Sequence, residues 1–134
     1  SRFPLHIGID LFVESRLRGR FGMLSLSRTL RSIGPVDAGL IGSLGMAGGG
    51  DFAVLEGGLF FNLPVYPGRC SFDLEAGISR LQARGGASSD TENFWGARVR
   101  FAPLRHERLY LLLGMRDGEL EEPSLRAGVA FGRR

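Results

Sequence analysis

Residues 5–14 read LHIGIDLFVE, and this stretch indicates the fold of the chain. Successive side chains of a β-strand point to opposite faces, so an aliphatic residue at every second position predicts a strand with one apolar face. That face holds Leu5, Ile7, Ile9, Leu11 and Val13. The opposite face holds His6, Gly8, Asp10, Phe12 and Glu14.

The same alternation recurs along the chain and predicts eight strands separated by turn-forming residues. After Leu5–Glu14, they are expected at Gly19–Arg28, Val36–Ala47, Phe52–Leu63, Ser71–Ala83, Asn93–Ala102, Leu109–Arg116 and Ser124–Gly132. Strands in such close series predict an all-β fold. We expect one domain over residues 1–134, a closed antiparallel eight-stranded up-and-down (meander) barrel that is transmembrane.

The second strand is the least regular. Its apolar residues change face between Phe21 and Met23 on one side and Leu24 and Leu26 on the other. A β-bulge in this segment would account for the change.

Composition excludes several other classes of protein. The 134 residues are 43% hydrophobic and 23% charged, which is typical of a folded domain. Glycine occurs 21 times, a load that disfavours a helical bundle. A single cysteine rules out an intrachain disulfide, and the 17 basic residues, all arginine, form no basic stripe that would indicate nucleic-acid binding.

Period-2 alternation does not say which face points inward. A soluble barrel encloses its apolar face, whereas a membrane barrel turns that face to lipid and encloses the polar one. Glycines on the polar face, such as Gly58, Gly77 and Gly114, favour the membrane arrangement, because they leave room for long side chains inside a narrow barrel. On a solvated face they would only weaken the strands.

Charges on the polar face divide along the chain, with acids in the first five strands and arginines in the last three. Closing the sheet brings opposite signs together, and pairing offsets their loss of hydration. We therefore predict a lumenal network of His6, Asp10, Glu14, Glu56, Asp73, Glu75, Arg98, Arg100, Arg116 and Arg126. We predict lipid contact for Leu5, Ile7, Ile9, Leu11, Leu55, Leu59, Leu74, Trp95, Val99, Leu111, Leu113, Val129 and Phe131.

The segment Leu125–Phe131 alternates apolar residues and finishes on an aromatic. It resembles the closing strand of bacterial outer-membrane β-barrels, and with the meander the chain resembles the small eight-stranded superfamily of OmpA-like and opacity-type proteins. The resemblance implies a place in a Gram-negative outer membrane. The chain departs from the pattern where Gly132, Arg133 and Arg134 follow the aromatic, and where Trp95, Tyr66 and Tyr110 are the only Trp and Tyr residues for an interfacial girdle.

Three functions are compatible with this pattern. The preferred one is a non-enzymatic structural or interaction role, with a plugged lumen and no open pore. The second is a soluble lipocalin-like carrier whose cavity is lined by Leu5, Ile7, Ile9, Leu55, Leu59, Leu74, Leu111 and Val129. The third is a lipid-modifying outer-membrane hydrolase or acyltransferase that uses His6 and Asp10 with a serine such as Ser25, Ser43 or Ser79.

Few binding partners are predicted. The chain shows no metal-ligand spacing and no cofactor motif, so we expect no metal, no cofactor and no catalytic residue. Membrane lipid is the expected partner. A protein could bind through the barrel wall or through the loops near Arg16–Arg20, Gly85–Glu92 and Asp117–Pro123. The pattern does not predict an oligomeric state.

Overall fold

The computed structural model describes residues 5–14, 20–47, 52–66, 69–83, 89–102, 109–118 and 123–132. These ranges form eight strands, and none of them contains a helix long and apolar enough to cross a membrane. The strands are β1 (Leu5–Glu14), β2 (Arg20–Ile33), β3 (Val36–Ala47), β4 (Phe52–Tyr66), β5 (Cys70–Ala83), β6 (Ser89–Phe101), β7 (Leu109–Gly118) and β8 (Ser124–Gly132).

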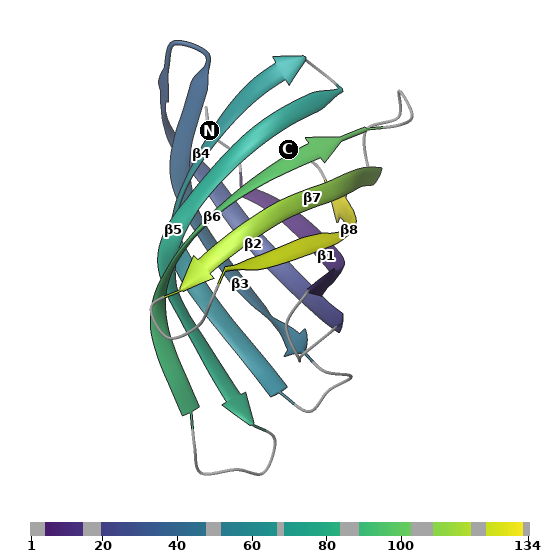
Figure 1. The fold of residues 1–134 in the computed structure, drawn as a ribbon. Helices are drawn as coiled ribbons and strands as arrows, with labels where there is room; N and C mark the ends of the chain where they lie inside the picture. The colour runs from purple at the N-terminus through teal and green to yellow at the C-terminus, as the bar shows by residue number, and fades with distance from the viewer. Residues whose placement is uncertain are drawn as a thin grey trace.

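Each strand pairs antiparallel with the next one along the chain, and β1 pairs with β8 to close the barrel. The tilted strands wind around one lumen, with the start of β1 and the finish of β8 at the same end of the barrel (Figure 1). The predicted eight-stranded antiparallel meander is therefore confirmed.

We call the end where β1 begins and β8 finishes the terminal end. Strands β2, β4 and β6 finish there, and β3, β5 and β7 begin there. The β2–β3 connection is a two-residue turn in which Gly34 has a φ of +61°, a backbone conformation that glycine adopts without strain. Strands β1, β3, β5 and β7 finish at the opposite end. Most residues of the three loops proposed to bind a protein fall outside the described residues.

The predicted bulge among Phe21–Leu26 is wrong. That segment alternates regularly: Phe21 and Met23 are buried in the lumen, and Leu24 and Leu26 are exposed on the outer wall. The register of β2 with β3 shifts instead between Thr29 and Arg31. Sequence alone misplaced the bulge because an apolar side chain facing the lumen was counted as facing outward.

Several strands also run further than predicted. β2 continues to Ile33 and not to Arg28, β4 to Tyr66, and β6 begins at Ser89. The last four residues of β2 are all exposed, so the hairpin extends beyond the closed wall. Without a buried face there is no alternation in the sequence to mark such an extension.

Close approach of the inner strands explains part of the glycine content. Gly58 of β4 and Gly77 of β5 are direct partners on the lumenal face. A Cβ atom on Gly58 would lie 2.6 Å from the Cα atom of Gly77, which is closer than real Cβ atoms come. The two strands pack at this point only because neither residue has a side chain.

Candidate functional site

All ten residues predicted for the lumenal network are buried or half-buried in the structure. They come from β1, β4, β5, β6, β7 and β8 and line the lumen from one end to the other. Among them Asp73, Arg100 and Arg116 are buried.

Arg98 of β6 lies at the centre of the network. Its guanidinium contacts three carboxylates: Nη1 is 3.2 Å from Asp10 Oδ2, Nη2 is 3.1 Å from Glu75 Oε1, and Nε is 3.2 Å from Asp73 Oδ2. Its cross-strand partner is Gly114, where a Cβ atom would lie 2.8 Å from Arg98 Cβ. The lack of a side chain at Gly114 therefore leaves space for the Cβ atom of Arg98.

Asp73 of β5 is shared between strands. Its side chain is fully buried, accepts a hydrogen bond from Asn62 Nδ2 and from Arg98 Nε, and lies 2.9 Å from Arg100 Nε. Two guanidinium groups therefore pair with one carboxylate that has no access to water, and one of them is shared with Asp10 and Glu75. Such multiple pairing is what keeps a buried charge tolerable.

A second group of side chains is built around Glu56 of β4. Arg116 of β7 binds it with both terminal nitrogens, and the Nη2 to Oε1 distance is 2.8 Å. Ser79 Oγ donates a further hydrogen bond of 2.8 Å to Glu56 Oε2. The Arg116 guanidinium also lies 3.9 Å from the centre of the Phe94 ring, in the position for a cation–π contact.

The third group lies toward the opposite end. Arg126 Nε donates to Glu14 Oε2 at 2.7 Å, and its guanidinium lies over the ring of Phe12, 4.6 Å from the centre. Phe12 stacks on Phe21 with a centroid separation of 4.9 Å. These rings belong to an apolar cluster that occupies the opposite end, made of Phe12, Phe21, Met23 and Val54 with Phe52 and Leu81 packed against it.

Sequence reasoning missed the aromatic partners of the arginines. Arg100, Arg116 and Arg126 lie against Tyr110, Phe94 and Phe12 respectively. The signal was present, because Phe12, Phe94 and Tyr110 all occupy positions of the polar face. A large ring at such a position has only the lumen to fill. The supporting hydrogen bonds from Asn62 and Ser79 were missed as well.

The residues of the enzyme hypothesis are partly brought together. His6, Asp10 and Ser25 line one small cavity in the lumen. Asp10 is paired with Arg98, while Ser25 Oγ donates to the Gly8 carbonyl at 3.4 Å. Ser79 is bonded to Glu56. Within the described ranges no group of three or more His, Cys, Asp or Glu side chains is arranged to hold a metal ion.

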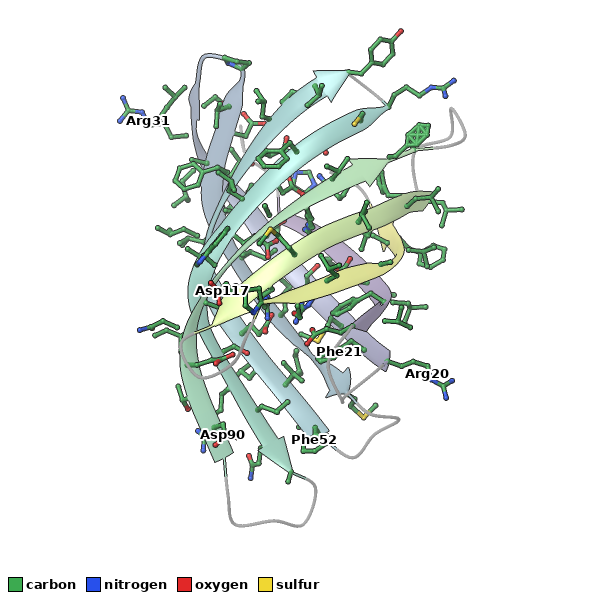
Figure 2. All side chains as sticks on the ribbon, in the orientation of Figure 1. Arg20, Phe21, Arg31, Phe52, Asp90 and Asp117 are labelled. Carbon is green, nitrogen blue, oxygen red and sulfur yellow. The ribbon has the colours of Figure 1, made fainter. Side chains whose placement is uncertain are left out.

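The outer wall carries the opposite chemistry. Twelve of the thirteen residues predicted to contact lipid are exposed, and Val129 is half-buried. Exposed fractions reach 65% at Leu113 and 56% at Leu55. Figure 2 shows Arg20 and Arg31 pointing away from the barrel, each near a different end. Of the aromatic residues considered for an interfacial girdle, Trp95 and Tyr66 are on this wall, whereas Tyr110 faces the lumen.

Solved structures share this architecture. The N-terminal barrel domain of Pseudomonas aeruginosa OprF superposes with a TM-score of 0.62 at 14% identity, covering 96% of this chain and 97% of that one. This is the fold of small outer-membrane β-barrels. Yersinia pestis outer-membrane protein Ail gives a TM-score of 0.58 at 16% identity over 96% and 98% of the two chains. A transmembrane β-barrel designed de novo gives 0.60 at 13% identity over 96% and 94%.

The likeness is one of fold. No protein-family model matches the sequence, and no curated protein does either.

Proposed function

We propose that this chain is a non-enzymatic barrel of a bacterial outer membrane, with a structural or interaction role and a lumen plugged by its own side chains. Membrane lipid is its partner along the apolar wall. An interaction with another protein would use that wall or the loops at the opposite end.

One observation carries the proposal: compared with a soluble barrel, the polarity is inverted, with apolar side chains on the outer wall and charged side chains in the lumen. Leu113 is 65% exposed on the outer wall, while Asp73 in the lumen is 0% exposed. Exposing rows of Leu, Ile and Val to water would forgo about 25 cal/mol for each Å² of apolar surface left unburied. A hydrocarbon environment removes that cost, and the enclosed charges satisfy one another by pairing.

The geometry disfavours the soluble carrier. The eight residues suggested to line its cavity all lie on the outer wall, and Leu5, Ile7, Leu55 and Leu59 are each at least half exposed. An apolar ligand inside would instead meet Arg98, Arg116 and their carboxylates.

The enzyme alternative is less well supported, because two of its three candidate serines donate their hydrogen bonds elsewhere. A nucleophilic serine needs a base within hydrogen-bond reach. Ser25 donates to a backbone carbonyl and Ser79 to Glu56, while the Asp10 carboxylate is paired with Arg98. We therefore assign no catalytic residue.

Trp95 tests the membrane assignment. It is the only tryptophan in the chain and is 47% exposed on the outer wall. In the barrel refolded into lipid vesicles, we expect acyl-chain-brominated lipids to quench its fluorescence strongly and aqueous acrylamide to quench it weakly.

A matched control moves the indole to the inner face. The neighbouring residue Phe94 is buried in the lumen, so the double variant Trp95→Phe, Phe94→Trp should respond far less to brominated lipid. Equal quenching of both proteins, or a wild-type protein that stays monodisperse in buffer without detergent, would contradict a membrane-spanning barrel.

The plug is tested by leakage. Vesicles that contain the folded barrel should retain a trapped small dye as well as empty vesicles do, because eight strands enclose only enough space for their own side chains. Rapid release of the dye would show that the lumen conducts.

A further inference from the structure

At the terminal end the lumen widens into a polar cavity of about 230 Å³, which we call the vestibule. The residues of its wall come from strand ends and from the β4–β5 connection, and they include His6, Asp37, Arg69, Cys70, Arg100 and Tyr110. Phe60 lines it as well and is 1% exposed, while Arg100 is 8% exposed. The cavity shares His6 and Arg100 with the lumenal network.

Three polar side chains of the vestibule are already engaged. Arg100 Nε is 2.9 Å from Asp73 Oδ2, and Asn62 donates to the same carboxylate. Asp37 Oδ1 accepts a hydrogen bond of 2.6 Å from Ser32 Oγ.

Arg69 and Tyr110 are different. Over the described part of the chain, the Arg69 guanidinium has no ion pair and the Tyr110 hydroxyl has no hydrogen bond. Arg69 is nevertheless held in place by its backbone, because its N–H donates to Tyr66 O at 2.9 Å and its carbonyl accepts from Ala102 N at 2.7 Å. A guanidinium and a phenol therefore line one cavity, and neither has a side-chain partner for its donors among the residues that the structure describes.

We propose that the vestibule binds a small ligand through a carboxylate group, which pairs with the Arg69 guanidinium and accepts a hydrogen bond from the Tyr110 hydroxyl. The planar guanidinium matches the two oxygens of a carboxylate. Asp37 on the same wall repels anions, and it repels a phosphate dianion more than a singly charged carboxylate. This site is independent of the proposed membrane role.

Cys70 provides the measurement. It is the only cysteine of the chain and lines the vestibule, so the rate at which a neutral maleimide modifies it reports whether the cavity is occupied. In the refolded full chain, benzoate at constant ionic strength should slow the reaction in a saturable way. The variant Arg69→Gln should bind benzoate about tenfold more weakly, since a charge-assisted hydrogen-bonded pair is lost. Tyr110→Phe should weaken binding by a smaller factor.

The control is Arg31→Gln, which removes the same charge from an exposed side chain that points away from the barrel (Figure 2). Its affinity for benzoate should match that of the wild-type protein. The proposal is overturned if benzoate has no saturable effect, if Arg69→Gln responds like wild type, or if inorganic phosphate binds more tightly than benzoate. Should the thiol not react, calorimetric titration of the same variants with benzoate makes the same comparison.

A negative result here is separable from failure of the membrane assignment. A barrel that refolds in lipid with its Trp95 quenched by brominated acyl chains, but binds no benzoate, loses only the vestibule site. A protein that stays monodisperse without detergent loses the membrane role, and benzoate binding can still be measured in buffer.

Discussion

The two faces of strand β6 show how this barrel is organised. Trp95, Val99 and Phe101 are exposed on the outer wall, while Arg98 and Arg100 point inward and pair with carboxylates of other strands. The same backbone thus presents aliphatic and aromatic groups to the surroundings and ionic groups to the lumen. The stability that the inner face contributes depends on specific ion-pair partners. The stability that the outer face contributes depends on whether its apolar side chains meet water or hydrocarbon. Substitutions on the two faces should therefore differ in size and in kind.

The largest effect is expected from Arg98→Leu. The change leaves Asp10, Asp73 and Glu75 without the guanidinium that they share, and removing one member of a buried ion pair costs about 3–5 kcal/mol. Denaturant titration of the vesicle-refolded barrel should show this loss in the free energy of unfolding. An unchanged unfolding midpoint would mean that the lumenal charges are solvated and that their pairing contributes nothing.

An outward charge tests the other face. Leu59 lies in the middle of β4 and is 50% exposed, so Leu59→Arg should cost about 2–4 kcal/mol if this position faces the centre of a bilayer. The control is Leu30→Arg near the terminal end of β2, for which about 0–1 kcal/mol is expected in lipid. A neutral effect at both positions would place the outer wall in water.

The smallest effects come from adding a single methyl group to each face. Gly114→Ala would put a Cβ atom 2.8 Å from Arg98 Cβ and 2.9 Å from the Ala97 carbonyl oxygen, and such overpacking costs about 1–3 kcal/mol. Gly57→Ala on the outer wall meets no atom closer than 3.9 Å, and should be neutral or stabilise the barrel by about 0.4–1 kcal/mol. Unfolding titrations of the two variants side by side measure the difference. Equal effects would show that the lumenal glycines have no packing role.

The fold was predictable because its signal is local. The alternation of faces follows from residues two positions apart, as in Leu5–Glu14, and the number of strands follows from the turn-forming residues between them. The errors arose where that signal is absent or ambiguous. The exposed end of β2 has no buried face, and Phe21 and Met23 are apolar residues that fill the lumen.

The local pattern of residues is enough to show which side chains share a face and that the charged set is separated from the aliphatic set. The partners of each charge follow only from the closed barrel, because they depend on register and on closure of the sheet. Arg98 meets Asp10 across 88 residues of chain, and Arg126 meets Glu14 across 112 through the β1–β8 seam. The vestibule likewise exists only because seven strands end at one mouth and bring Arg69 and Tyr110 to a common cavity. No local period encodes such contacts, since they are set by how all eight strands tilt and stagger around one axis.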